Sequence, residues 1–322
     1  MLSVIGLHAS FPFGGYVDNY ELAYYYTVAI FGLAIPLFFM VSGYLMLGHR
    51  NVTYRYCLHK IWGILKFTAI VIGAFWLVFS IKQGSFELRL LRDYYVGSFL
   101  QYGPFGIFWY FGAMMLLYVV LPIIYRLYKD CSRKFLYLLA FVAIICCIAF
   151  IINLLRTPIG GGEKAVVQTF RVWNWLLYFM LGGVMRQKSE FFRKWRYQLV
   201  LSSLCLFGLI EVYGISRMGR VGAEYYYASP VTWIYAMSVF GLILSFDIPR
   251  SMTPVMKTLG NLFLPVYVFH VFIIQHTYKI AEYISFLRGL APLAYWLIVS
   301  LITLGISWIV MKIPYVNKVF RI

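Results

Sequence analysis

A histidine within an apolar segment is the first feature of this chain that could carry out chemistry. His8 lies in the middle of Leu2–Phe13, whose other residues are apolar or small. An ionisable side chain inside an apolar span is costly, so it usually faces a bundle interior or a polar cavity and marks a functional site. The alternative is a structural role, in which the ring is hydrogen-bonded to a neighbouring helix.

General base catalysis is the chemistry that suits His8 best. Free histidine has a pKa of about 6.5, so near neutral pH its imidazole can remove a proton from a poor nucleophile such as a hydroxyl group. The sequence contains no GxSxG elbow and no Cys-His pairing that would supply a competing nucleophile. We therefore take His8 as the candidate catalytic base.

A second histidine, His270, lies in a late apolar segment, three residues after Tyr267. Residues three apart lie on the same face of a helix, so these two side chains are predicted to be neighbours. His270 either orients a substrate or holds a hydrogen bond between helices, and both interpretations remain open.

A basic segment, Gly48–Lys60, follows the second apolar span and is expected to form a turn at the cytoplasmic surface. It contains Arg50, Arg55, His59 and Lys60. Clusters of arginine and lysine bind phosphate groups, and this one is a candidate cofactor-binding site at Arg50, Arg55 and Lys60. The same residues could serve as ordinary positively charged anchors at the cytoplasmic surface of a membrane.

Five other polar or aromatic residues are candidates for substrate binding or for supporting the site. Ser42 precedes Gly43 and could line a polar surface or allow close helix packing. Trp109 and Tyr110 could stack on a sugar or an adenine, or belong to the aromatic belt at a membrane interface. Arg171 and Asn174 lie one turn apart and could contact a polar acceptor.

Composition identifies the class of protein. The 322 residues are 62% hydrophobic and only 12% charged, whereas a soluble domain carries about 25% charged residues. The net charge of +17 is not gathered in a basic arm or a nucleic-acid module, so no nucleic-acid partner is expected. The five cysteines lack metal-ligand spacing, and neither a metal site nor disulfides are predicted.

Apolar runs long enough to cross about 30 Å of hydrocarbon as helices recur along the whole chain. We predict an all-α fold, a polytopic transmembrane bundle of about ten helices in a single domain over residues 1–322. The expected spans are Leu2–Phe13, about Val28–Leu47, Ile61–Ile81, Pro104–Leu127, Phe135–Leu155, Thr169–Met185, Gln198–Ile215, Tyr227–Phe246, Gly260–Lys279 and Ala294–Met311.

Loop charges predict the orientation of this bundle. Positive charges are concentrated in the segments after spans two, four, six and eight and after the last span, whereas the alternate loops are mixed or acidic. The positive-inside rule therefore predicts that these segments and the C-terminus lie in the cytoplasm.

The first span is too short for a complete crossing. Leu2–Phe13 offers about a dozen residues before Gly14-Gly15, whereas a crossing needs about 20. It has no basic region and no good cleavage context, which argues against a signal peptide. We expect the first helix to be truncated and the natural start of the protein to lie upstream.

Several segments, taken in order, resemble the acyltransferase 3 family of integral membrane O-acetyltransferases. The segment PLFFMVSGYL around Ser42 resembles a PxFFxxSGF/Y pattern that lies one helix after a functional histidine. Phe108–Phe111 with Tyr118 and Pro122, LYFMLGG at Leu177–Gly183, and GNLFLPVYVFH at Gly260–His270 are similar to later family segments. The resemblance is to the envelope-glycan type, such as the enterobacterial common antigen O-acetyltransferases.

The resemblance implies acetyl transfer from acetyl-CoA to a hydroxyl of a bacterial surface carbohydrate or its lipid-linked precursor, with His8 as the essential base. It also implies an inner-membrane location and no permanently bound cofactor. Family members carry an arginine eleven residues before the histidine, a position that here falls before Met1. The family's basic cluster corresponds to the region of Arg55 and Lys60, although the spacing differs.

A transporter or flippase for a polar or anionic solute is the alternative function, because broken helices and buried polar groups suit it equally well. A transporter of this kind often shows an internal repeat, and the sequence contains no convincing self-similarity. A purely structural scaffold gives no reason for His8, Ser42 and His270 within apolar helices.

Overall fold

The computed structural model describes residues 1–13, 30–156, 166–216 and 227–320. Within these ranges all regular secondary structure is helical and no strand occurs. The predicted all-α fold is therefore confirmed.

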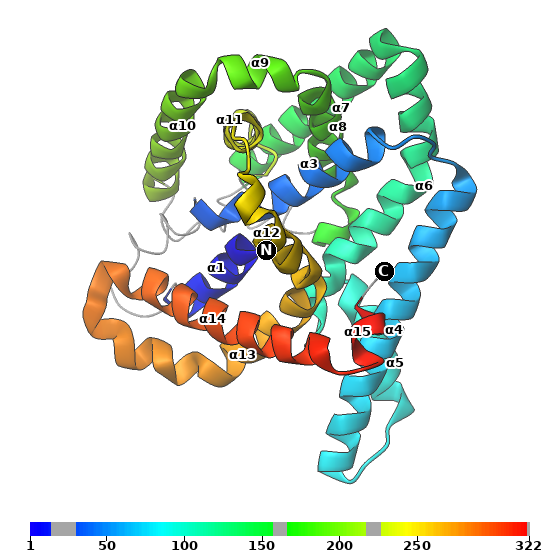
Figure 1. The fold of residues 1–322 in the computed structure, drawn as a ribbon, viewed down its shortest axis with the longest axis vertical. Coiled ribbons are helices and arrows are strands. Elements are labelled where there is room, and N and C mark those ends of the chain that lie inside the picture. The colour runs from blue at the N-terminus through cyan, green and yellow to red at the C-terminus, as the bar shows by residue number, and fades with distance from the viewer. Residues whose placement is uncertain (14–29, 157–165, 217–226, 321–322) are drawn as a thin grey trace. The chain divides into compact units, whose positions relative to one another are not determined.

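The main helices follow the apolar runs of the sequence, and each overlaps one predicted span. They are α1 (Leu2–Ser10) with the 3-10 turn η1 (Phe11–Phe13), α3 (Ala34–Leu47), α4 (Tyr54–Gln83), α6 (Trp109–Asp130), α7 (Ser132–Arg156), α8 (Val172–Gln187), α10 (Arg196–Ser216), α11 (Pro230–Ser245), α13 (Phe263–Tyr283) and α14 (Ala291–Lys312) (Figure 1).

Among the described residues, five helical stretches are long and apolar enough to cross a membrane. A sixth is added if α11 and the segment Arg250–Asn261, bent by 107° from it, form one broken span. The chain is therefore a multi-pass membrane protein by length and composition of its helices, and the number of ten crossings stays a prediction.

Four shorter helices were not predicted: α5 (Leu88–Phe99), α9 (Ser189–Lys194), α12 (Thr253–Asn261) and α15 (Val316–Val319). Only α12 overlaps a predicted span, at Gly260 and Asn261. In α5, Arg89, Arg92 and Asp93 interrupt the apolar pattern, and both arginines pair with Asp93. Because of these charges, the sequence pattern predicts a loop of mixed charge here and not a helix.

The long helix α4 begins earlier than its apolar run. The side chain of Thr53 accepts a hydrogen bond from the backbone N–H of Tyr56 at 3.2 Å, which satisfies one of the unpaired donors of the first turn. The helix ends at Gly84, whose φ of 70° is readily adopted only by glycine. Because α4 starts at Tyr54, Arg55 and Lys60 lie on a helix and not in a turn.

The chain divides into two compact units, Met1–Phe38 with Gln187–Arg321 (the first unit) and Phe39–Arg186 (the second unit). The division falls within α3. The single domain expected from the sequence stays a prediction.

In the second unit, α4 and α6 pack side by side, α5 packs on both, and α7 packs on α6 (Figure 1). The backbones of α3 and α8 also approach closely. A Cβ atom on Gly43 would lie 1.8 Å from the carbonyl oxygen of Phe179, and one on Gly182 would lie 2.0 Å from that of Met40. The close helix packing considered for Ser42-Gly43 is therefore present, as expected where lipid supplies little hydrophobic driving force.

In the first unit, α1 lies against α13 and α14 (Figure 1). The indole N–H of Trp296 in α14 donates to the carbonyl oxygen of Leu2 at 2.9 Å. On another side, the ring of Phe31 fills the space that a side chain at Gly6 would need, because a Cβ atom there would lie 2.4 Å from the ring. These contacts hold the short helix that carries His8.

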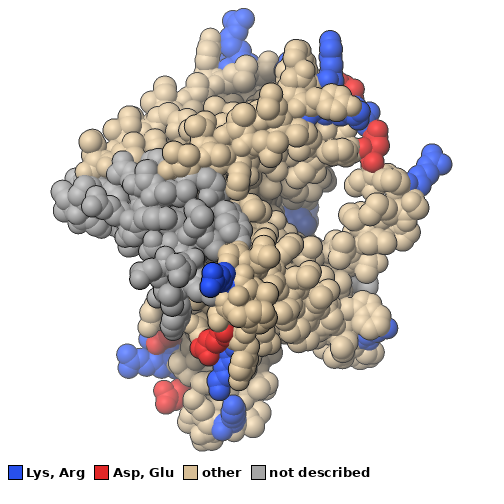
Figure 2. Space-filling model, turned by 90° about the vertical axis from the view of Figure 1, so that its left-hand side faces the viewer, with Lys and Arg blue, Asp and Glu red and all other residues tan. Residues whose placement is uncertain are grey.

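The surface is mainly uncharged on the face shown in Figure 2. Helix α7 also has an apolar surface, because Tyr137, Phe141, Ile144 and Ile148 are all more than half exposed and follow helical spacing. Such a surface suits contact with lipid.

Candidate functional site

His8 is positioned on α1 so that its half-buried side chain reaches an open pocket of about 300 Å³. The lining residues are His8, Pro12, Val271, Ile274, Gln275 and Tyr278. The walls are mostly apolar, with an amide, a phenol and an imidazole among them. A volume at the lower end of the range for small-molecule sites fits one small ring or a short chain segment.

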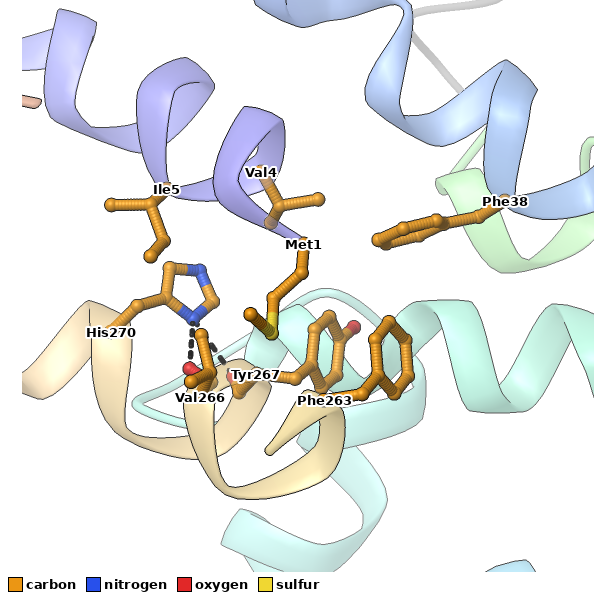
Figure 3. Close-up of a pocket in the computed structure, with 8 residues that line it drawn as sticks. All are labelled: Met1, Val4, Ile5, Phe38, Phe263, Val266, Tyr267 and His270. Carbon is orange, nitrogen blue, oxygen red and sulfur yellow. Dashed lines mark hydrogen bonds between the residues drawn. The ribbon is translucent and has the colours of Figure 1, made fainter. Parts of the chain in front are cut away.

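His270 lies on α13 and is fully buried. Its Nδ1 lies 2.8 Å from the carbonyl oxygen of Tyr267 and 3.2 Å from that of Val266 (Figure 3). Carbonyl oxygens only accept hydrogen bonds, so Nδ1 carries a proton and donates it. In the neutral ring, Nε2 is then the unprotonated nitrogen with a lone pair.

The pocket beside His270 is narrow and closed. It is lined by α1 and α13 residues together with Phe38, and it leaves essentially no free volume for water (Figure 3). Tyr267 stacks on Phe263 with ring centroids 6.3 Å apart and also lies 5.9 Å from the ring of His270. The predicted proximity of Tyr267 and His270 is therefore present in the structure.

The structure brings the two candidate histidines together. The ring centroids of His8 and His270 lie 5.1 Å apart, with an angle of 51° between the ring planes. His8 borders the open pocket and His270 borders the closed one. The arrangement is a pair of imidazoles, one accessible and one fully enclosed.

A second group of candidate residues lies in the second unit. Ser42 and Tyr110 are joined by a hydrogen bond of 3.3 Å between their hydroxyl oxygens. Phe39 lies 5.0 Å from the ring of Tyr110 and stacks on Trp175 at 4.8 Å, and Trp175 in turn contacts Trp109 at 5.2 Å. Ser42, Trp109 and Tyr110 thus form one aromatic and hydroxyl cluster, and their contact with a substrate stays a prediction.

Arg171 and Asn174 are enclosed within the second unit. Their exposed fractions are 2% and 0%, and the Nε of Arg171 donates to the carbonyl oxygen of Val166 at 2.8 Å. The 3-10 turn η5 (Gln168–Phe170) that precedes them is held by Thr169, whose hydroxyl donates to the carbonyl oxygen of Phe99. The pair is adjacent as predicted, but it lies inside the unit and not at its surface.

The basic segment is largely exposed. Arg50 lies before α4, and its carbonyl oxygen accepts a hydrogen bond of 2.8 Å from the hydroxyl of Tyr125. Arg55 is exposed on the first turn of α4, while the ammonium group of Lys60 lies 6.0 Å from the ring centroid of Tyr56. Five positions along a helix place Arg55 and Lys60 on different faces.

The sequence did not single out Gln275, Tyr278 or Arg186 as site residues. Val271, Ile274, Gln275 and Tyr278 follow i, i+3, i+4, i+7 spacing, which could have identified their common face on α13. Arg186 lies over the ring of Tyr44 at 5.0 Å and donates to its carbonyl oxygen at 3.3 Å. In the sequence, Arg186 was considered only as one of the positive loop charges that predict the orientation of the bundle.

Comparison with known proteins gives one match. The family model described as an acyltransferase domain matches residues 1–312. The comparison with curated proteins and the comparison with solved structures gave no match.

Within the described residues, no group of three or more His, Cys, Asp or Glu side chains is arranged to hold a metal ion.

Proposed function

Because the chain belongs to the acyltransferase 3 family, we propose that it is a membrane O-acetyltransferase that transfers an acetyl group from acetyl-CoA to a carbohydrate hydroxyl. The family match and the apolar helices support membrane acyltransferase activity. The donor, the acceptor and the base are our proposal. The acceptor is a bacterial surface carbohydrate or its lipid-linked precursor, as in the envelope-glycan type that the sequence resembles.

The observation that carries the proposal is the position of His8 at a pocket of about 300 Å³. In the proposed reaction the acceptor binds there, and its hydroxyl donates a proton to His8. The hydroxyl oxygen attacks the thioester carbonyl carbon, the C–S bond breaks, and the departing thiolate takes the proton from the imidazolium. The products are the O-acetyl ester and free coenzyme A, and His8 is restored.

The lining of this pocket suits an acceptor with both apolar and polar groups. Val271 and Ile274 supply an apolar wall, while the amide of Gln275 and the hydroxyl of Tyr278 can exchange hydrogen bonds with sugar hydroxyls. A pocket built from apolar walls and a few polar groups is typical of small-molecule sites.

We propose that Arg50, Arg55 and Lys60 contact the phosphates of acetyl-CoA, since all three lie at the same end of α4 and are charged. The loop charges support a cytoplasmic position for this end and for the C-terminus, in the inner membrane of a bacterium. The donor would then be supplied from the compartment in which coenzyme A is made.

The test is transfer of labelled acetyl from acetyl-CoA into envelope glycan by membranes that contain equal amounts of wild type, His8→Ala or His276→Ala. His276 is the matched control, because it is an exposed histidine of α13 whose Nδ1 bonds to the carbonyl oxygen of Phe272 at 2.7 Å. We expect transfer by wild type and His276→Ala and loss of transfer in His8→Ala.

Two other results would change the assignment. Equal transfer by all three proteins would leave an acyltransferase with a different base. No transfer by any of them, with several glycan acceptors offered, would contradict the proposed reaction and favour a transporter or flippase.

A further inference from the structure

We propose that His270 is a positioning residue for His8: its Nε2 accepts a hydrogen bond from the His8 ring and stabilises the imidazolium that forms when His8 takes the acceptor's proton. The inference rests on the proposed function and assigns a second side chain to the same site.

The tautomer of His270 follows from its backbone contacts. Nδ1 donates to the carbonyl oxygens of Tyr267 and Val266, at 2.8 and 3.2 Å, so the proton of the neutral ring is on Nδ1. These two bonds also prevent the ring from rotating to exchange its nitrogens. Nε2 is therefore a hydrogen-bond acceptor in a fixed direction.

That acceptor is buried and has no partner within the part of the chain that the structure describes. Buried polar atoms are nearly always paired, and an exception calls for an explanation. Figure 3 shows that Nε2 is the ring nitrogen on the side of α1, the helix that carries His8. Apart from Tyr267 and the α-amino group of Met1, the other groups lining this pocket are apolar.

Nε2 of His270 makes no hydrogen bond within the described residues, and the separation of the two rings is one at which a bond to His8 can form. An N–H···N bond of about 2.9 Å joins two imidazoles whose centroids lie roughly 5 Å apart, and the observed separation is 5.1 Å. When His8 becomes an imidazolium, both of its nitrogens are donors. One can return the proton to the leaving thiolate while the other donates to Nε2 of His270.

Burial decides which histidine has which role. His270 is fully enclosed and does not line the open pocket, so an acceptor hydroxyl cannot reach it. His8 lines that pocket and is the ring that meets substrate. A base oriented by a third group is the general logic of catalytic triads, and here a neutral imidazole supplies the third group.

A neutral partner has an advantage within an apolar bundle. A carboxylate at this position would place a permanent charge in the span, which is costly. With two neutral imidazoles, the pair itself adds no charge to the site until His8 accepts the proton. The stabilisation is then largest in the charged state that the reaction creates, which is the condition for accelerating the chemical step.

The test compares His270→Asn with His270→Gln in the purified full chain. Asparagine can keep a donor near the Nδ1 position and has nothing at the Nε2 position, whereas glutamine can place its amide oxygen there. We expect His270→Asn to lower kcat roughly 10- to 100-fold, with KM for acetyl-CoA and for acceptor changed less than about twofold. We expect His270→Gln to recover at least about tenfold of that loss.

His276→Asn and His8→Ala serve as controls in the same assay. Equal losses in His270→Asn and His270→Gln, whatever their melting temperatures, would overturn the proposal, because a structural role does not distinguish an acceptor at Nε2. Unchanged kcat in His270→Asn with inactive His8→Ala would also overturn it while leaving the proposed function intact. Full activity of His8→Ala would show that His8 is not the base. His270 would then have no base to position.

A second measurement needs only folded wild type and His8→Ala. In protein labelled with ¹⁵N-histidine, we expect the His270 ring to give the spectrum of the Nδ1–H tautomer, with its Nε2 resonance moved by the His8→Ala change. An Nε2 resonance that is the same in both proteins would overturn the proposal even if His270→Asn does not fold.

Discussion

His8 and His270 lie near opposite ends of the sequence, and their rings meet at a centroid separation of 5.1 Å. The contact depends on α1 packing against α13, with Ile5 and Ala9 of α1 and Val266 and Ile274 of α13 in one buried cluster. Only His8 of the pair borders the open pocket.

Replacing His8 by Gln should lower kcat by roughly 10²- to 10⁴-fold, the usual contribution of a general base. Glutamine keeps the polarity and approximate size of the side chain but does not take up a proton. Steady-state kinetics with acetyl-CoA and a glycan acceptor would measure the effect, with thermal melting as the check on folding. A kcat within twofold of wild type would exclude His8 as the base.

Enlarging a side chain that lines the open pocket should weaken binding of the acceptor without weakening binding of acetyl-CoA. We expect Val271→Phe to raise KM for the acceptor several-fold, because the ring would occupy part of a pocket of about 300 Å³, and to leave KM for acetyl-CoA unchanged. Val78→Phe, on an exposed position of α4, is the matched control. A rise in KM for acetyl-CoA alone would indicate that the pocket holds the donor.

Removing the charges of the basic segment should weaken donor binding. The variant with Arg50→Gln, Arg55→Gln and Lys60→Gln should raise KM for acetyl-CoA roughly tenfold, since each exposed charge contact is worth only about 0.2 to 1 kcal/mol. The effect should be smaller with acetyl-3′-dephospho-CoA, which lacks one phosphate. The control neutralises Lys82, Arg89 and Arg92, at and beyond the other end of α4.

If the first triple variant and the control behave alike, the three charges serve only as membrane anchors. Protein amounts in the membrane should be compared alongside the kinetics, because loss of anchoring charges lowers insertion and not KM.

Adding a methyl group where α3 meets α8 should destabilise the second unit. Gly43→Ala and Gly182→Ala each direct a Cβ at a backbone carbonyl oxygen, which cannot rotate away, so we expect about 1 to 3 kcal/mol of destabilisation. Gly73→Ala in α4 meets nothing within 4 Å and should be neutral or stabilising. Thermal melting in detergent would measure all three, and equal melting temperatures would contradict the observed packing.

Helix positions could be predicted closely because they depend on local patterns. Each apolar run became a helix, and Leu2–Phe13 corresponds to α1 with η1. The prediction missed α5, where charged residues interrupt the apolar pattern, and it treated Arg55 and Lys60 as part of a turn. The cap that Thr53 provides was readable in the sequence, but hydropathy alone does not detect it.

The surroundings of individual polar residues were less predictable. Arg171 and Asn174 were candidates for contact with a polar acceptor, and the structure encloses both of them within the second unit. Ser42 and Tyr110 were separate candidates, and the structure joins them by a hydrogen bond between α3 and α6. Such contacts depend on how each helix is rotated toward its neighbours.

The sequence by itself determined that this is a helical membrane protein of the acyltransferase class, because hydropathy, charge distribution and short motifs are properties of adjacent residues. Only the tertiary structure decided that His8 meets His270, that His8 opens onto a pocket with Gln275 and Tyr278, and that the second histidine is enclosed. The physical reason is that contacts between helices depend on their order, rotation and tilt. Those quantities follow from packing over the whole unit and not from the spacing within any one helix.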